Sequence, residues 1–229
     1  MWLVLIPILL LGCAGASEII VGQSGTNYSL IQAAIDASAP GDTIKVQSGA
    51  YNENVNINKA LNLIGVDSGN GRPLVNAGGS GSVITISANN STVQGFNITG
   101  SGGCGCGHSG IKVLSSNNLI MDNIVYKNKY GIFIDAAGSN NTLVANDLVN
   151  NSITISDSGK NTSWDASSKP GGLQGLLEIF SGPQIKGNHY SDYDEASEGC
   201  NDTNNDHICD KPKVIGSSLD SYPSISAMN

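Results

Sequence analysis

The stretch GIKVLSSNNLIMDNIVYKNKYGIFIDAAGSNNTLVANDLVNNSITISD, residues 110–157, carries the pattern that decides the fold. Apolar–polar–apolar triplets recur in it and just before it at similar spacing. One set is Ile84/Ile86, Ile111/Val113, Ile132/Ile134 and Ile153/Ile155, at spacings of 27, 21 and 21 residues. A second set interleaves with it at spacings of 27 and 23: Val93-Phe96-Ile98, Ile120-Asn123-Val125 and Leu143-Asn146-Leu148. Two independent ladders of similar period indicate a structural repeat.

Strand geometry explains what this repeat builds. Alternate residues of a strand point to opposite faces, so each triplet places two aliphatic side chains on one face. A coil of 21–27 residues forms one rung of short strands, and successive rungs stack in parallel around an aliphatic column. We predict an all-β protein, a single-stranded right-handed parallel β-helix over residues 17–157. Asn123 and Asn146 occupy equivalent positions, where their amides can hydrogen-bond along the axis.

The open ends of a solenoid need covers, because an uncovered parallel edge invites aggregation. At the N-terminal end, apolar residues at helical spacing predict a cap helix over about residues 29–38, with Tyr28 or Ser29 near its N-cap. Pro40-Gly41 ends this helix. Strands are expected directly after it, at residues 43–46, 55–57 and 61–66.

At the C-terminal end the repeat stops after about residue 157. An irregular capping segment is expected over residues 158–229. Its aromatic side chains, Trp164, Tyr190 and Tyr193, are expected to form a lid over the open core, and the apolar segment 172–180 to pack with them. The alternative is that these aromatic rings lie on the exterior and bind sugar.

The first residues, MWLVLIPILLLGCAGASE, are apolar and then small, and they predict a secretory signal peptide over residues 1–16. Ala14-Gly15-Ala16 is a small-x-small cleavage site. Alternatively, Leu10-Leu11-Gly12-Cys13 resembles a lipobox, which would leave a lipidated Cys13 at the new N-terminus. Export is therefore predicted, to the cell surface or the space outside the membrane. Soluble secretion and a lipid anchor both stay open.

Composition supports a solvated extracellular protein. The chain has only 3 Phe and 2 Trp, and it has 29 Gly. Because few large aromatic side chains are present to fill a wide core, a thin core of small aliphatic side chains is favoured. The net charge is −8 and Arg72 is the single arginine, which argues against nucleic acid and anionic membrane surfaces as partners. Sequons that permit N-glycosylation begin at Asn27, Asn89, Asn90, Asn97, Asn140, Asn150, Asn161 and Asn201.

Several stretches resemble known families. Residues 28–37, 40–44 and 49–54 look like the opening of pectinase-type right-handed β-helices. The Asn-rich rungs resemble the NosD-like β-helix repeats of exported archaeal surface proteins, and the stretch 187–195, continuing through 200–210 and 221–223, resembles the tail of that group. The resemblance implies the fold and a cell-surface context, without implying an activity.

The segment from Cys200 to Asp210 is a candidate calcium loop. A hard divalent cation needs oxygen ligands from several positions of a tight loop. Here positions 1, 3, 5 and 9 offer side-chain oxygens, and position 7 offers a backbone carbonyl. These positions are Asp202, Asn204, Asp206 and Asp210, with the carbonyl of Ile208 at position 7. His207 replaces the usual glycine at position 6, and histidine is enriched among non-glycine residues with positive φ. Lys213 stands where an EF-hand has its glutamate, so a shorter structural calcium loop is expected.

Cys200 and Cys209 bracket this loop and are expected to form a disulfide, because an even number of cysteines in an exported chain favours disulfides. Three pairings of the four cysteines remaining after Cys13 stay open. Two other interpretations of the loop also stay open. One is a solvated acidic turn with a disulfide and no ion, and the other is a transition-metal site built from Cys200, Cys209 and His207.

Cys104-Gly-Cys106-Gly-His108 is a candidate soft-metal site. Two sulfurs and an imidazole within five residues can hold Cu(I) or zinc, and the resemblance to NosD implies a link to copper-site maturation. Against copper transport, the chain lacks the repeated Met, Cys and His of a copper carrier. The flanking glycines equally predict a flexible loop whose cysteines pair.

Catalysis is not expected. Lyase chemistry needs a base, usually an arginine, and Arg72 lies in an early Gly-Asn-Gly loop away from the ladders. Glycosidase chemistry needs facing carboxylates, and those of the ladder region share no position: Asp122, Asp135, Asp147 and Asp157. We expect a structural or adhesive surface module, with cell-surface glycans or surface-layer proteins as partners. The alternatives are a polysaccharide lyase, hydrolase or epimerase, and a periplasmic copper-delivery protein.

Overall fold

The computed structural model describes residues 15–166 and 187–227. The lipobox cysteine Cys13 and all of the predicted signal peptide except its last two residues lie outside the described residues. The apolar segment 172–180 lies outside them too.

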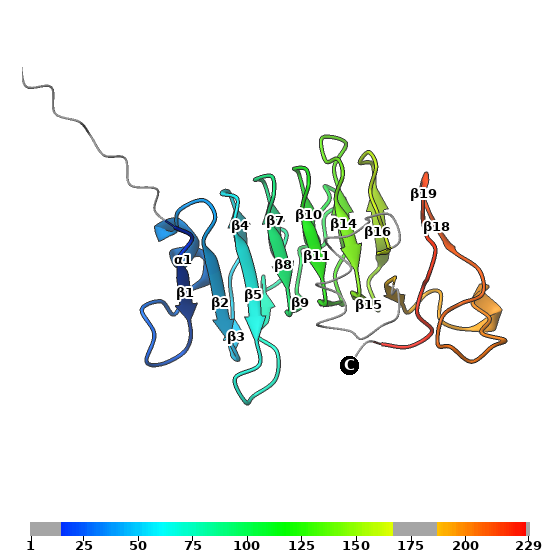
Figure 1. Cartoon of the computed structure of the whole chain (residues 1–229), viewed down its shortest axis with the longest axis horizontal. Helices are drawn as coiled ribbons and strands as arrows, with labels where there is room; N and C mark the ends of the chain where they lie inside the picture. The colour runs from blue at the N-terminus through cyan, green and yellow to red at the C-terminus, as the bar shows by residue number, and fades with distance from the viewer. Residues whose placement is uncertain (1–14, 167–186, 228–229) are drawn as a thin grey trace, which may run out of the picture.

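The described chain is a parallel β-helix, as predicted, and Figure 1 shows its strands stacked along the long axis. Three sheets run along the solenoid, in the orders β1-β2-β5-β8-β11-β14, β17-β15-β12-β9-β6-β3 and β16-β13-β10-β7-β4. Each full rung gives one strand to each of the three sheets, in the order in which the sheets are named above. The first full rung consists of β2, β3 and β4. The strands are β1 (Glu18–Val21), β2 (Thr43–Gln47), β3 (Ala50–Tyr51), β4 (Val55–Ile57), β5 (Asn62–Val66), β6 (Leu74–Asn76), β7 (Ile84–Ile86), β8 (Thr92–Gln94), β9 (Asn97–Thr99), β10 (Ser109–Val113), β11 (Leu119–Met121), β12 (Ile124–Tyr126), β13 (Tyr130–Ile134), β14 (Thr142–Val144), β15 (Asp147–Val149), β16 (Ile153–Asp157) and β17 (His189–Tyr190).

Both predicted ladders are present, with one error of register. Ile84 pairs with Ile111, and Ile111 with Ile132, as expected. Ile132 then pairs with Ile155, and not with Ile153 as the spacing of 21 predicted. A slip of two residues keeps every side chain on the same face, so the alternation cannot detect it. The slip also explains why Ile153 is 38% exposed.

Asparagine columns at the corners set the correct register. Asn118, Asn123 and Asn128 stand at the three corners of one rung, and the Nδ2 of each donates to the Oδ1 of the asparagine 23 residues later, at 2.9, 3.0 and 3.2 Å. The residues directly before these six asparagines all have φ between 53° and 59°: Asn117, Asp122, Lys127, Asn140, Ala145 and Asn150. A left-handed residue followed by an asparagine therefore makes each corner of these two rungs. The sequence ladder predicted the column of Asn123 and Asn146 and missed the other two.

The cap helix α1 spans Ile31–Ala37, shorter than expected, and its ends are held from a later part of the chain. Neither Tyr28 nor Ser29 caps it. The Glu53 carboxylate accepts hydrogen bonds from the backbone N–H groups of Ile31 and Gln32 at 2.9 and 3.0 Å. At the other end the Lys59 ammonium donates to three carbonyl groups, those of Ile35, Asp36 and Ser38. A negative charge at the N-terminal end of a helix and a positive charge at its C-terminal end are both stabilised by the helix dipole.

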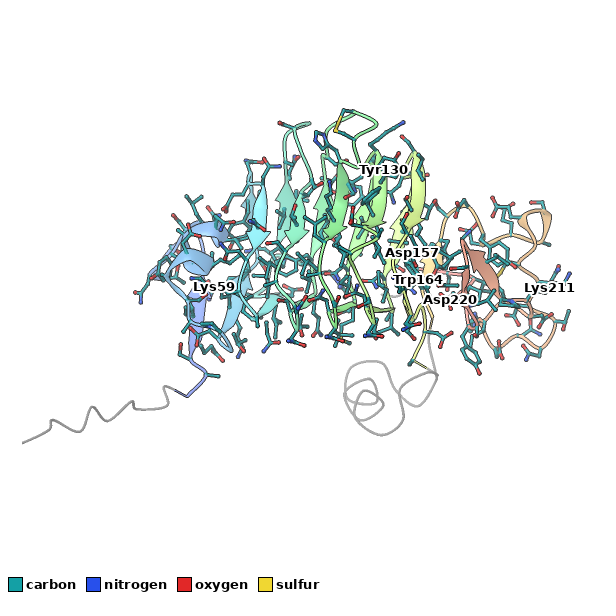
Figure 2. The ribbon with its side chains drawn as sticks, turned by 90° about the horizontal axis from the view of Figure 1, so that it is seen from above. Lys59, Tyr130, Asp157, Trp164, Lys211 and Asp220 are labelled. Atoms are coloured by element: carbon teal, nitrogen blue, oxygen red, sulfur yellow. A yellow bond between two sulfur atoms is a disulfide. The ribbon has the colours of Figure 1, made fainter. Side chains whose placement is uncertain are left out.

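The C-terminal segment adds a partial rung before it becomes irregular. β17 pairs with β15, and the Asn123–Asn146 column continues to Asn188, whose Oδ1 accepts from Asn146 Nδ2 at 2.9 Å. Trp164 and Tyr190 are fully buried in the main core, and Tyr193 packs against it, which confirms the predicted lid. The short 3-10 helix η1 (Ala196–Glu198) and the antiparallel hairpin of β18 (Lys213–Ile215) and β19 (Ser218–Asp220) follow. Figure 2 shows Asp157, Trp164 and Asp220 where the solenoid meets this segment.

Candidate functional site

The acidic loop is closed as predicted. Cys200 and Cys209 form a disulfide across nine residues, and both are 3% exposed. The second disulfide joins Cys104 to Cys106, so the open question of pairing is answered. The transition-metal alternative for the acidic loop needs thiolates at Cys200 and Cys209, and the disulfide removes them.

The oxygen atoms of the acidic loop face its own backbone. Asp202 accepts hydrogen bonds from the N–H groups of Asp206 and His207 at 3.1 and 3.0 Å. Asn204 Oδ1 also accepts a hydrogen bond from the Asp206 N–H. The Asp206 carboxylate accepts from the Ile208 N–H, and the Asp210 carboxylate accepts from the Thr203 N–H. His207 has φ 67°, as expected for the residue at position 6. The five predicted ligand residues therefore share one tightly turned loop, although the four polar side chains among them accept hydrogen bonds from N–H groups.

The loop with Cys104, Cys106 and His108 brings its three predicted ligands closer together than the acidic loop brings its carboxylates. In the described parts of the chain, Cys104, Cys106 and His108 form the one group of three His, Cys, Asp or Glu side chains whose ligand atoms lie within 4.8 Å of one another. The carboxylates of the acidic loop are not such a group. His108 Nδ1 lies 3.2 Å from Cys104 Sγ. A disulfide sulfur carries no proton, so the ring nitrogen is the donor in this contact.

The stems of this loop are fixed to the solenoid. Gly102 N–H donates to the Gly81 carbonyl at 2.7 Å, and Tyr130 N–H to the His108 carbonyl at 3.3 Å. A Cβ on Gly102 would lie 2.5 Å from His108 Nδ1 and 2.9 Å from the Gly81 nitrogen, so only glycine allows the ring to approach this closely. Cys104 and Cys106 themselves are exposed at the tip.

Arg72 is closer to the solenoid than expected. Its guanidinium donates to the carbonyl and, at 2.8 Å, to the carboxylate of Asp122, a corner residue of the ladder. Asp147 is buried beside His189, whose Nδ1 lies 3.6 Å from the carboxylate and whose Nε2 lies 3.2 Å from Asp194. These pairs tie a loop and the C-terminal segment to the rungs, and the spacing of carboxylates in the sequence predicted neither.

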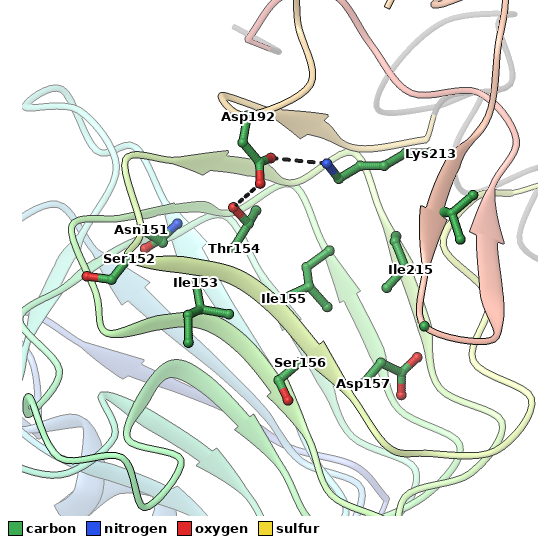
Figure 3. A pocket seen from close by; sticks show the side chains of 12 residues that line it. Asn151, Ser152, Ile153, Thr154, Ile155, Ser156, Asp157, Asp192, Lys213 and Ile215 are labelled. Atoms are coloured by element: carbon green, nitrogen blue, oxygen red, sulfur yellow. Dashed lines mark hydrogen bonds and ion pairs between the residues drawn. The ribbon is translucent and has the colours of Figure 1, made fainter. Parts of the chain in front are cut away.

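A groove of about 630 Å³ lies between β16 and the C-terminal hairpin. Figure 3 shows Asp192 at its rim, where it accepts from Thr154 Oγ1 at 2.7 Å and from Lys213 Nζ at 3.1 Å. The residues lining the groove, all in the described chain, include no aromatic side chain on which a sugar could stack: Asn151, Ser152, Ile153, Thr154, Ile155, Ser156, Asp157, Asp192, Lys213, Val214, Ile215 and Gly216.

Asp220 is a buried carboxyl that the sequence did not single out. It ends the column of asparagines: its Oδ2 accepts from Asn188 N–H at 2.7 Å and from the Tyr190 hydroxyl at 2.8 Å, and its Oδ1 accepts from Tyr222 N–H at 3.0 Å. Burial raises the pKa of Asp220 to about 6, against the lowering effect of these donors. Burial, together with the Asp220 charge, also raises the pKa of Tyr190.

The Asp220 carboxyl makes stability depend on pH. Its pKa is about 6 in the folded state and takes its ordinary value of 3.8 in the unfolded chain, so between these values the folded state binds more protons. The free energy of unfolding is therefore expected to fall by up to about 3 kcal/mol as pH rises through this window. Urea denaturation at pH values from 4 to 7 measures this. Asp220→Asn, which removes the titrating group, is expected to lose this slope. An equal slope in the variant contradicts the assignment.

The family match agrees with this architecture. A family model described as periplasmic copper-binding protein (NosD) matches residues 74–195, just over half of the chain. The chain belongs to the NosD family. The matched NosD region contains the asparagine corners and the loop with Cys104, Cys106 and His108, and it ends before the acidic loop.

The NosD-family chain is also similar to a cell surface glycoprotein of Methanothermus fervidus, with 41% identity over 101 residues. The alignment covers 43% of this chain and 16% of the glycoprotein. The chain thus corresponds to a small part of that relative's length. The helices in the described residues fall short of the length and apolar character that a bilayer span requires.

Proposed function

We propose that this chain is an exported, non-catalytic β-helix module of the cell surface, with a structural or adhesive role and a structural calcium ion in its C-terminal loop. The observation that carries the surface role is the 41% identity to a cell surface glycoprotein. Seven of the eight sequon asparagines are exposed, and Asn97 is partly buried. Exposed acceptors and an acidic surface support a glycosylated rod whose partners are surface glycans or surface-layer proteins.

Surface location is tested on intact cells. Brief protease treatment is expected to remove the protein from whole cells, while a cytoplasmic marker stays intact. Detergent partitioning of the released and retained material then separates a lipid anchor at Cys13 from soluble secretion. Protection of the protein in intact cells contradicts the surface role. Release of new reducing ends or unsaturated products from uronate polysaccharides would support the alternative, a polysaccharide-processing enzyme.

Calcium is expected to raise the melting temperature. The proposed ligands are Asp202, Asn204, Asp206, Asp210 and the Ile208 carbonyl. The folded state holds their loop in one tight turn, so we expect an ion to bind the folded state more tightly than the unfolded one. At a calcium concentration about 100-fold above Kd the stabilisation is about 2.7 kcal/mol. Calorimetry with calcium and with EDTA measures the difference.

Matched variants locate the effect. Asp206→Ala is expected to lose the calcium-dependent shift, whereas Asp36→Ala, which removes an exposed carboxylate on α1, is expected to keep it. No shift in the unmodified chain contradicts the calcium proposal, and a full shift in Asp206→Ala places the ion elsewhere.

A second candidate function is soft-metal binding, with Cu(I) as the metal. It is favoured by the close approach of the Cys104, Cys106 and His108 ligand atoms and by the copper-binding description of the family whose match includes them. Copper would be a cargo on this exposed loop. Uptake of one Cu(I) by the chemically reduced chain supports this function, and no uptake in either redox state removes it.

A further inference from the structure

We propose that the Cys104–Cys106 disulfide is a thiol-reducible gate on the soft-metal site that these cysteines form with His108. This inference rests on the second candidate function and adds its regulation. The oxidised loop holds no copper, and reduction by an external thiol converts the same loop into a site for one Cu(I).

The chemistry of sulfur makes the disulfide a closed state. The thiolate is the form of cysteine that binds metals, and a disulfide sulfur carries no charge. In the oxidised loop His108 is the single strong ligand of the three. One imidazole on an exposed loop does not hold Cu(I) against water and competing ligands, so metal affinity depends on breaking the bond between Cys104 and Cys106.

The two disulfides of the protein differ in accessibility. Cys104 and Cys106 are exposed at the tip of a loop, whereas Cys200 and Cys209 are each 3% exposed. An attacking thiolate must reach a sulfur atom along the S–S axis, so access controls the rate of exchange. The Cys104–Cys106 disulfide also closes a sequence separation of 2 residues and the Cys200–Cys209 disulfide a separation of 9, so the shorter one constrains the unfolded chain less. A mild reductant is therefore expected to open the Cys104–Cys106 disulfide and leave the Cys200–Cys209 disulfide intact.

The solenoid keeps the three ligands together after reduction. Ser101 N–H donates to Asn128 Oδ1 at 3.1 Å, and Ser109 N–H to Ser82 Oγ at 3.2 Å, so both stems are bonded to neighbouring rungs. The Phe133 ring packs closely against Gly107: a Cβ added to Gly107 would lie 3.2 Å from the ring. The loop that reduction frees therefore spans only a few residues, and the entropic cost of closing it around a metal ion is small.

The redox step balances with a low-molecular-weight thiol as reductant. The thiolate of a first thiol attacks one sulfur, the Cys104–Cys106 bond breaks, and a mixed disulfide forms. A second thiol attacks the mixed disulfide and releases the oxidised reductant. The loop gains two electrons and two protons, and the reductant loses them. Cu(I) binding then displaces protons from the two cysteine thiols.

The test uses the whole chain in two redox states. One sample is kept oxidised, and the other is treated with a low-molecular-weight thiol that is then removed without air. Alkylation and peptide mass mapping identify which cysteines are free. Each sample is titrated with Cu(I) supplied from a coloured chelator complex. The oxidised chain is expected to take up no Cu(I), and the reduced chain one per chain, with Cys104 and Cys106 free and Cys200 and Cys209 still paired.

Variants separate the gate from the metal function. Cys104→Ser/Cys106→Ser is expected to bind no Cu(I) in either state, although it keeps Cys200 and Cys209. His108→Ala is expected to bind at least about tenfold more weakly after reduction, whereas His207→Ala, the matched histidine of the other disulfide loop, is expected to bind normally. Circular dichroism of each variant verifies that the β-helix is intact.

Two failures are distinguishable. No uptake by the fully reduced chain removes the soft-metal function, and the gate with it. Equal uptake by the oxidised and reduced chains, or uptake that survives in the double serine variant, overturns the gate and leaves copper binding elsewhere on the protein.

Discussion

Replacing Asn146 with alanine is expected to lower the free energy of unfolding by roughly 3–6 kcal/mol. Asn146 is fully buried at a corner of the solenoid. Its Oδ1 accepts from both the backbone N–H and the Nδ2 of Asn123, and its Nδ2 donates to the Ile120 carbonyl at 2.9 Å. Alanine leaves these groups buried without their partner, and each unsatisfied group costs about 1–3 kcal/mol.

Urea denaturation followed by circular dichroism measures this loss. The matched control is Asn89→Ala. Asn89 Oδ1 also accepts a backbone N–H of the next rung, that of Ser116 at 2.8 Å, but the residue is exposed and water replaces it. The control is expected to cost less than about 1 kcal/mol. Similar losses in the two variants would show that burial of the asparagine column does not control stability.

Truncation of Trp164 to alanine is expected to cost about 3–5 kcal/mol. Trp164 is fully buried and closes the C-terminal end of the core, where the partial rung leaves aliphatic side chains uncovered. Its Nε1 donates to Asp157 at 3.2 Å, and its carbonyl accepts from Asn188 Nδ2 at 2.6 Å. Removing the ring opens a cavity between the last rung and the segment that covers it.

The size of the ring, rather than its N–H group, is expected to dominate. Trp164→Phe keeps most of the volume and loses the bond to Asp157, whose carboxylate retains Gly159 N–H at 2.8 Å. It is therefore expected to retain more than half of the stability that the alanine variant loses. Equal losses in both variants, measured by urea denaturation, would instead assign the effect to the hydrogen bond.

The register error at β16 shows the limit of periodicity as evidence. The triplet Ile153-Thr154-Ile155 keeps the same alternation at spacings of 21 and 23, because a shift of two residues turns no side chain to the other face. At the actual spacing of 23, Ile155 pairs with Ile132 and Asp157 pairs with Ile134. The polar corners distinguish them, since Asn123 and Asn128 must stand above Asn146 and Asn151 to share their amides. Counting the asparagines together with the aliphatic residues would have given the correct rung.

The sequence by itself determined the parallel β-helix, its N-terminal cap helix, the aromatic lid and the positive φ of His207, because these depend on local alternation, helical spacing and backbone preference. Only the tertiary structure decided which distant groups meet. Glu53 and Lys59 hold the ends of α1, Arg72 binds Asp122, and Asp220 ends the asparagine column. It also decided that the soft ligands, rather than the carboxylates, gather within 4.8 Å. The physical reason is that a rung brings together residues about 20 or more positions apart, and a one-dimensional pattern records their type but not their distance.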